Sequence, residues 1–169
     1  MLSGETAVGG WPAIAVRTMS HIAETVERYV GDRERSQPIS RLLDTREVDA
    51  ALAQGVWRMA YDLDVKLIAV WSHGGNIARI CSKLRPPVPI VALTESPRAV
   101  RRMALYFAVH PLRMDVPQSV TDFAPKLDER LLATGLAHDG DEVLIIGGTV
   151  IGSTGRSNAI VVHTVGQPA

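Results

Sequence analysis

The sequence has only one cysteine, Cys81, among its 169 residues. A single thiol cannot form an internal disulfide, and it excludes every zinc site built on several cysteines. We therefore expect a reducing compartment and predict a cytoplasmic protein. An excess of charge is also missing, because 18 Lys and Arg balance 18 Asp and Glu. A chain with no net positive charge has no general attraction to nucleic acid or anionic lipid, so we expect neither as a partner.

Long apolar runs are absent as well. The longest, such as residues 67–71 and 143–146, have four or five residues, whereas a membrane-spanning helix needs about 20. The first twenty residues lack a basic segment followed by an apolar one, so no export signal is expected. What the sequence does have is the length of one ordinary domain, sufficient to bury a real core without disulfides or metal.

Apolar residues recur with the period of helices and of strands in turn. Strands are predicted over residues 65–71, 88–93, 109–114, 142–146 and 159–165. Helices are predicted over residues 12–30, 45–62, 77–84 and 121–133, and from Ser96-Pro97 through Val100, Met103 and Phe107.

Particular residues mark the ends of these helices. Pro12 is typical of a first helical position, and Gly31 and Gly135 are typical of the residue after a helix. The spacing of Asp44 and Glu47 is that of a capping box. Pro125 is expected to delay or kink the last helix.

Strands that alternate with helices favour a mainly parallel sheet covered on both faces. Only a loop, residues 147–157, joins the last two strands, so the fifth strand should run antiparallel at an edge. The predicted fold class is α/β, a three-layer α/β/α sandwich with a mainly parallel five-stranded sheet.

Two loops of this fold are rich in glycine and hydroxyl residues, residues 72–76 and 147–157. Ligands of open α/β sheets bind where loops leave the carboxyl ends of the parallel strands. The first loop opens a helix, whose free N–H groups can hold a phosphate. The second offers Ser153, Thr154 and Ser157 as donors and Arg156 as a bidentate clamp. The alternative is that both loops are turns whose glycines only permit positive φ.

Other chemistry is less well supported by the sequence. No nucleotide-binding glycine motif is present, and neither loop contains a lysine. No acid is placed to orient His73 beside Ser72, which argues against a hydrolase. Cys81 falls on an apolar helix stripe and is expected to be buried and inert. The five histidines show no metal-ligand spacing, and Arg98, Arg101 and Arg102 are interpreted as a solvated helix face.

Several segments carry a resemblance to a known family. Residues 1–7 (MLSGETA), with Gly9, Pro12, Met19 and Ile22, resemble the last strand and helix of the catalytic barrel of pyruvate kinase. Residues 71–79 (WSHGGNIAR) resemble the effector-phosphate loop in the C-terminal domain of that family. Residues 89–94, 105–106, 135–138, 140–141 and 154–158 also match positions with like residues in the family.

The resemblance implies a barrel remnant at residues 1–31, a linker at 32–43, and a pyruvate kinase C-terminal-like domain at 44–169. It implies an effector site made of residues from both loops: Ser72, His73, Gly74, Gly75, Asn76, Ile77, Ser153, Thr154, Gly155, Arg156 and Ser157. Only Ser3 and Glu5 match the edge of the family's active site. In full-length members, barrel residues upstream of this segment hold ADP, phosphoenolpyruvate, Mg²⁺ and K⁺, so no metal or cofactor is expected in this chain.

The sequence also departs from the family pattern. Ile77 stands where the family usually has a hydroxyl residue, and Phe107-Ala108 stands where it has arginine and glycine. One hydroxyl donor to a sugar bisphosphate is thereby lost. The guanidinium of Arg156 is expected to compensate in part, because it binds phosphate as a fork.

Three functions remain open at this point. The first is the allosteric and subunit-contact region of a glycolytic pyruvate kinase, not catalytic alone, with its barrel on the same or a separate polypeptide. The second is a free-standing module that binds a phosphorylated metabolite. The third is an interaction domain whose effector loops have become structural. A homo-oligomer is expected, because residues 12–30 form an amphipathic helix and residues 159–165 an apolar edge strand.

Overall fold

The computed structural model describes residues 1–34, 47–117, 120–148 and 157–167. The chain divides into two compact units, an N-terminal unit of Met1–Gln37 and a C-terminal unit of Pro38–Ala169. The predicted linker begins within the last turn of a helix in the N-terminal unit, and the remainder of it lies outside the described residues.

Two helices make up the described part of the N-terminal unit, α1 (Gly4–Ala7) and α2 (Pro12–Glu34). The resemblance implied a strand near the start, whereas residues 4–7 form one helical turn. Helix α2 begins at Pro12, as predicted, and continues past Gly31 to Glu34. A glycine within a helix costs only about 1 kcal/mol and does not by itself end it.

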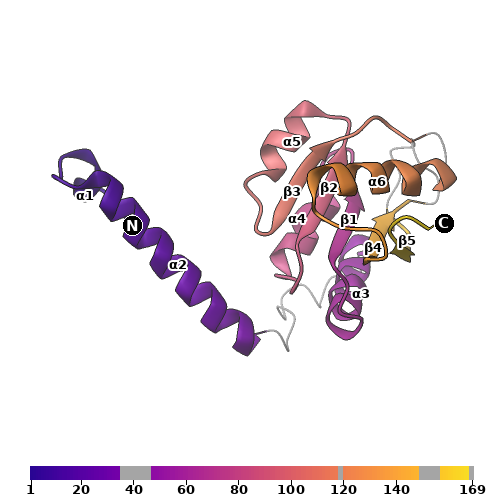
Figure 1. The fold of residues 1–169 in the computed structure, drawn as a ribbon, viewed down its shortest axis with the longest axis horizontal. Coiled ribbons are helices and arrows are strands. Elements are labelled where there is room, and N and C mark those ends of the chain that lie inside the picture. The colour runs from indigo at the N-terminus through magenta and orange to yellow at the C-terminus, as the bar shows by residue number, and fades with distance from the viewer. Residues whose placement is uncertain (35–46, 118–119, 149–156, 168–169) are drawn as a thin grey trace. The chain divides into compact units, whose positions relative to one another are not determined.

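The C-terminal unit is built on one five-stranded sheet (Figure 1). Its strands are β1 (Leu67–Trp71), β2 (Ile90–Thr94), β3 (Val109–Arg113), β4 (Glu142–Gly147) and β5 (Ala159–Thr164). They lie in the order β3-β2-β1-β4-β5, with every pair parallel except β4 and β5. The predicted mainly parallel sheet with an antiparallel last strand at its edge is confirmed.

Four helices cover the sheet: α3 (Val48–Asp62), α4 (Asn76–Lys83), α5 (Pro97–Met103) and α6 (Val120–Thr134). The predicted cap of α5 is confirmed, since the Ser96 hydroxyl accepts a hydrogen bond from the Ala99 N–H at 3.3 Å. Helix α6 ends as predicted at Gly135, which has φ of +66°. The Leu136 N–H then donates to the Leu131 carbonyl, which closes a Schellman-type cap.

Three boundaries differ from the sequence prediction. Helix α3 begins after Glu47, which makes no side-chain cap bond, and Asp44 of the predicted capping box lies outside the described residues. Helix α6 begins at Val120, so Pro125 does not delay its start. Phe107 is not helical, because α5 ends at Met103 and Ala108 adopts a φ of +56° as the chain turns into β3.

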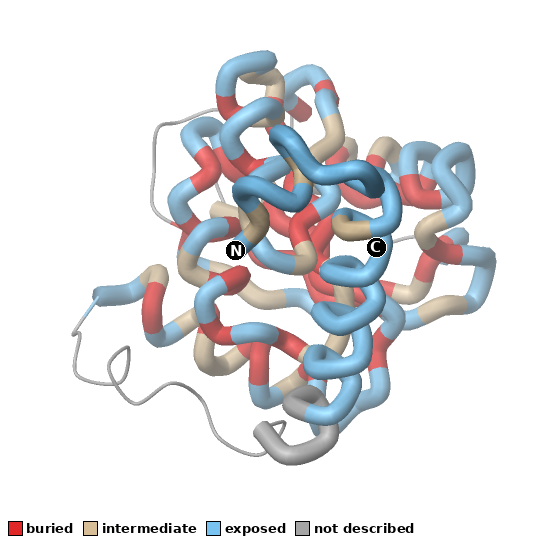
Figure 2. Tube along the Cα trace, turned by 90° about the vertical axis from the view of Figure 1, so that its left-hand side faces the viewer, coloured by how far each residue is buried: buried red, intermediate tan, exposed pale blue. Residues whose placement is uncertain are grey.

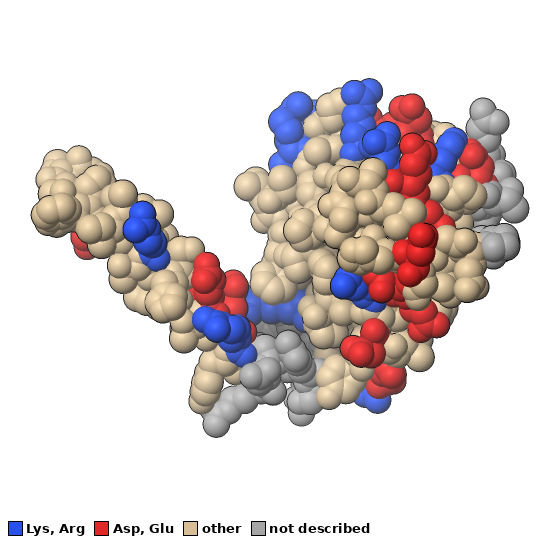
Figure 3. Space-filling view, in the orientation of Figure 1, with Lys and Arg blue, Asp and Glu red and all other residues tan. Residues whose placement is uncertain are grey.

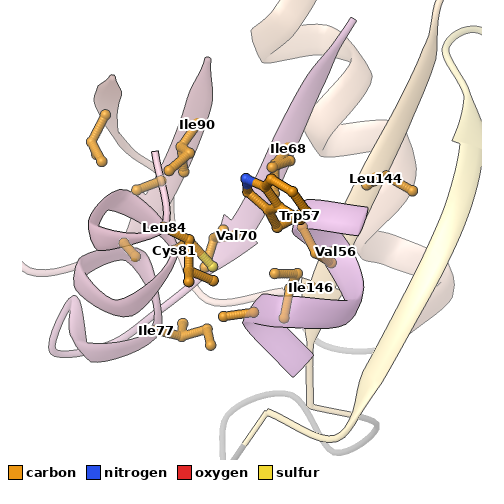
Figure 4. Packing of buried hydrophobic residues seen from close by; sticks show 14 of the residues in the cluster. Val56, Trp57, Ile68, Val70, Ile77, Cys81, Leu84, Ile90, Leu144 and Ile146 are labelled. Atoms are coloured by element: carbon orange, nitrogen blue, oxygen red, sulfur yellow. The ribbon is translucent and has the colours of Figure 1, made fainter. Parts of the chain in front are cut away.

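The core lies on both faces of the sheet, and alternate strand residues point to opposite layers. Helices α3, α4 and α5 pack on one face against Ile68, Val70, Ile90, Leu144 and Ile146. Figure 4 shows Val56 and Trp57 of α3 and Cys81 of α4 in this layer. Helix α6 packs on the other face through Phe123, Leu127 and Leu131 against Leu67, Val91, Val143 and Ile145. The unit is therefore the predicted α/β/α sandwich.

Candidate functional site

Strands β1 and β4 are parallel neighbours, so the loops that follow them leave the same edge of the sheet. The strand order reverses direction between these two strands, because β2 and β3 lie on one side of β1 and β5 on the other. Such a switch point is the usual ligand crevice of an open α/β sheet. The two loops singled out from the sequence are the ones that begin here. Ser153, Thr154, Gly155 and Arg156 lie outside the described residues, and Ser157 is buried.

The loop after β1 is a tight turn fixed by its own serine. The Ser72 N–H donates to the Leu93 carbonyl on β2 at 3.0 Å, and the Ser72 Oγ accepts from the Gly75 N–H at 2.9 Å. Gly75 has φ of +78° and is the N-cap residue of α4. A Cβ at this position would lie 2.8 Å from the Met103 Cγ, so both backbone conformation and space require glycine.

Helix α4 presents its amino end at this turn. Its first intrahelical hydrogen bond runs from the Arg79 N–H to the Gly75 carbonyl at 3.1 Å, so the N–H groups of Asn76, Ile77 and Ala78 precede the helical ladder. The Ile77 side chain is buried in the core, which leaves its backbone N–H as its means of contacting a ligand. A helix start of this kind favours an anion.

Two arginines lie at the turn, Arg102 from the neighbouring helix α5 and Arg79 from α4 itself. The guanidinium of Arg102, on α5, donates to the Gly74 carbonyl, and the guanidinium of Arg79 donates to the Asn76 side-chain oxygen at 3.1 Å. Figure 3 shows the basic side chains gathered over α5. The sequence interpretation of Arg102 as part of a solvated face missed its contact with the loop, because the partner is a backbone carbonyl 28 residues away.

Two carboxylates also border the turn, and neither was predicted. Glu95, which follows β2, lies with its Oε1 against the His73 Nδ1, so the expectation that no acid is placed to orient His73 is wrong. Asp49, in the first turn of α3, accepts a hydrogen bond from the Asn76 Nδ2 at 3.2 Å through its Oδ2. The second oxygen of each, Glu95 Oε2 and Asp49 Oδ1, is buried and has no hydrogen-bond partner among the described residues. The turn thus combines a helix start, which in general favours an anion, with two bordering acids.

Ser3 and Glu5 lie in the N-terminal unit, and both are exposed. The Ser3 N–H donates to the Glu5 Oε2 at 3.1 Å. Hydrogen bonds from the backbone N–H groups of Glu5 and Ser3 hold the pKa of the Glu5 carboxyl below its usual value. These contacts are local to the start of α1. A pocket elsewhere in this unit is lined by Thr6, Pro12, Ala13, Val16, Arg17 and Ser20.

The single thiol does not belong to the loop. Cys81 lies on α4, and its side chain is buried in the core. Burial, with a smaller contribution from the Asp49 charge, raises the pKa of this thiol to about 12. A protonated, enclosed thiol is a poor nucleophile, which agrees with the inert role predicted from the sequence.

Within the described ranges, no group of three or more His, Cys, Asp or Glu side chains is arranged to hold a metal ion. None of the helices described is both long and apolar enough to cross a membrane.

Comparison with known proteins gives consistent matches. Residues 50–163 match the family model described as "Pyruvate kinase, alpha/beta domain". Over 165 residues the chain is 33% identical to a pyruvate kinase of Lactococcus lactis, covering 98% of this chain and 32% of the relative. It is 35% identical over 167 residues to a pyruvate kinase of Bacillus licheniformis, covering 99% of this chain and 28% of the relative. The chain spans about a third of the length of the curated relatives it matches.

Proposed function

The chain belongs to the pyruvate kinase family as its C-terminal α/β domain, and from this premise we propose that it is the regulatory and subunit-contact region of a pyruvate kinase. The whole protein transfers a phosphoryl group from phosphoenolpyruvate to ADP in glycolysis. Mg²⁺ and K⁺ serve that reaction in the remainder of the protein, and this chain is not catalytic alone. Its own role is to bind a phosphorylated effector.

The observation that supports effector binding is the start of helix α4 at the switch point of the sheet. The turn formed by Ser72, Gly74 and Gly75 directs three backbone N–H groups away from the helical ladder. The phosphate of the effector accepts hydrogen bonds from these groups. The segment after β4, which contains Arg156, follows the strand next to β1, and in this proposal its side chains are the second set of donors.

The expected affinity follows from the number of these contacts. Hydrogen bonds to a charged phosphate contribute roughly 1.5 to 3 kcal/mol each. Three or four of them, opposed by the entropy of association, give dissociation constants in the micromolar to millimolar range. A sugar phosphate or nucleoside monophosphate is the class of ligand that fits.

Calorimetry with a panel of sugar monophosphates, sugar bisphosphates and AMP tests this proposal. We expect at least one member to bind with a dissociation constant below about 5 mM. Arg156→Ala should raise that dissociation constant about tenfold, as loss of a charge-assisted contact does. Arg130→Ala is the matched control, because Arg130 is an exposed arginine on α6, which covers the opposite face of the sheet. If no member binds, or if both arginine variants behave alike, the assigned effector site is wrong.

Contact with other protein surfaces, either the rest of the barrel or another subunit, is supported by apolar surface in both units. In the N-terminal unit, Met19, Ile22 and Val26 of α2 are all exposed, and Figure 2 shows most of this helix in the exposed colour. In the C-terminal unit, the edge strand β5 exposes Val161 and Val162. An apolar helix face and an open strand edge both favour association with another protein surface.

An interaction domain with structural effector loops is the second candidate, and one observation favours it. His73 and Arg102 already have partners within the protein, Glu95 and the Gly74 carbonyl. Under this alternative these contacts only stabilise the loop, and no phosphate binds there. The calorimetric panel separates the two candidates.

A further inference from the structure

His73, in the turn after β1, is tied to the end of β2 and to the residue after it by two contacts. The Thr94 Oγ1 donates to the His73 carbonyl at 3.1 Å and accepts from the Ser96 N–H at 3.2 Å. The second contact joins the His73 ring to the Glu95 carboxylate. Glu95 is therefore positioned by the end of β2 and by the cap of α5.

The side chains of this contact differ in their surroundings. The His73 side chain is 71% exposed, whereas that of Glu95 is 27% exposed. The Glu95 Oε1 contacts His73, while its Oε2 is buried without a partner among the described residues. His73 is also the single residue of the sequence Ser-His-Gly-Gly-Asn, residues 72–76, whose side chain can carry a positive charge.

A carboxylate and a phosphate compete for the same donors, because both are anionic hydrogen-bond acceptors. An anion at the start of α4 lies next to the Asn76 N–H, three residues along the chain from His73. When His73 is held by Glu95, the one side chain of this loop that can carry a positive charge is engaged by an internal acid.

We propose that Glu95 limits anion binding at this loop by holding His73, so that a phosphorylated effector binds only by displacing the carboxylate from the imidazole. The inference rests on the proposed function, since it assigns a regulating residue to the same site. Glu95 is a positioning residue: it acts on the ligand through His73. Asp49 does not play this part, because its partner is the neutral Asn76 amide.

The test is a titration of the full 169-residue chain with inorganic phosphate. Binding is measured from the ¹⁵N NMR chemical shifts of the backbone amides of Asn76, Ile77 and Ala78. Total ionic strength is held constant with chloride, because screening would otherwise change along the titration. Glu95→Gln keeps the shape of the side chain and removes its charge, and Glu95→Ala is the second variant. Glu129→Gln, an exposed acid on α6, is the control for loss of one negative charge elsewhere.

We expect Glu95→Gln to tighten phosphate binding about three- to tenfold, the size of effect that one partly exposed charge produces, and Glu129→Gln to change it less than twofold. In a His73→Ala background the gain from Glu95→Gln should fall below twofold, because there is no imidazole left to release. A wild-type chain that binds phosphate as tightly as Glu95→Gln overturns the inference and leaves the effector site standing. A gain that persists fully without His73 also overturns it. If phosphate shifts none of these amide signals in any variant, both the proposed effector site and this inference are wrong.

Discussion

His163 on the edge strand β5 places its Nε2 2.9 Å from the Oδ1 of Asp128 on α6, and both side chains are buried. The other carboxylate oxygen, Oδ2, accepts a hydrogen bond from the Gly166 N–H at 2.9 Å. One acid thus connects the helix, the last strand and the turn that follows it. Because both of its oxygens are paired, its burial is compensated by hydrogen bonds.

Removing this carboxylate should destabilise the domain markedly. Asp128→Ala leaves His163 buried without its partner, and we expect a loss of about 2–4 kcal/mol in the free energy of unfolding. Urea unfolding measures it. Asp62→Ala is the matched control, since Asp62 forms an exposed pair with Arg58 and its loss should cost less than about 1 kcal/mol. Equal losses in the two variants would show that the buried pair does not stabilise the fold.

The turn before α4 should tolerate no side chain at Gly75. Gly75→Ala combines a positive φ with a contact of 2.8 Å to Met103, and we expect it to destabilise the protein by about 2–4 kcal/mol. Gly135→Ala separates the two costs. Gly135 also has a positive φ, but a Cβ there meets no atom within 4 Å, so only about 1 kcal/mol should be lost. Thermal or urea unfolding that gives the same loss for both variants would contradict the packing argument.

The sheet was predictable because its strands are short apolar runs bounded by glycine, proline and polar residues. The same local chemistry placed the Ser96-Pro97 start of α5 and the Gly135 end of α6. Gly31 gave a false stop signal. A glycine ends a helix when the chain must turn there, and residues 32–34 instead continue α2.

The acids and the arginine around the candidate loop were not predictable from local patterns. Glu95 meets His73 because β1 and β2 are adjacent and end at the same edge, which brings residues 22 positions apart into contact. Arg102 reaches the Gly74 carbonyl across 28 positions for the same reason. Periodicity identified the loop and the helix it opens, whereas its partners depend on how separate elements pack.

Because its thiol is buried, Cys81 makes the free energy of unfolding of the protein vary with pH in the alkaline range. The pKa of Cys81 is raised from 9.0 to about 12, chiefly by burial. Between these values the unfolded chain loses the thiol proton while the folded chain keeps it. The contribution of the protonated thiol to folding stability is therefore complete below pH 9 and decreases as the pH rises. Wild-type stability should fall relative to Cys81→Ala by up to about 1.4 kcal/mol per pH unit in this window.

Urea unfolding of the two proteins at pH 8, 9 and 10 measures that difference, and comparison of the variants cancels the other groups that titrate. A difference between the two proteins that stays constant from pH 8 to 10 would contradict the raised pKa. As an independent check, an alkylating reagent at pH 8 should modify Cys81 only after unfolding. Rapid modification of the folded protein would place the thiol at the surface.

The exposed stripe of α2 should drive association. Met19, Ile22 and Val26 expose 44%, 57% and 52% of their surface, and burial of apolar area contributes about 25 cal/mol per Å². We expect a dimer or larger assembly in sedimentation or light scattering at about 100 μM, shifted toward monomer by Ile22→Glu. Glu24→Lys, on the polar side of the same helix, should leave the assembly unchanged. A monomeric wild-type chain at this concentration would rule out the stripe as a self-contact.

The central claim, that this chain is the regulatory region of a pyruvate kinase, is tested most directly on the native protein. Antibodies raised against the chain can isolate that protein from its source cells for a coupled assay with phosphoenolpyruvate, ADP, Mg²⁺ and K⁺. We predict turnover by a protein whose polypeptide, or whose chain taken together with one catalytic partner, has about three times the mass of this chain, the proportion seen in its relatives, and background activity for the isolated chain. A native protein of 18.3 kDa, isolated without a catalytic partner and without turnover, would contradict the account.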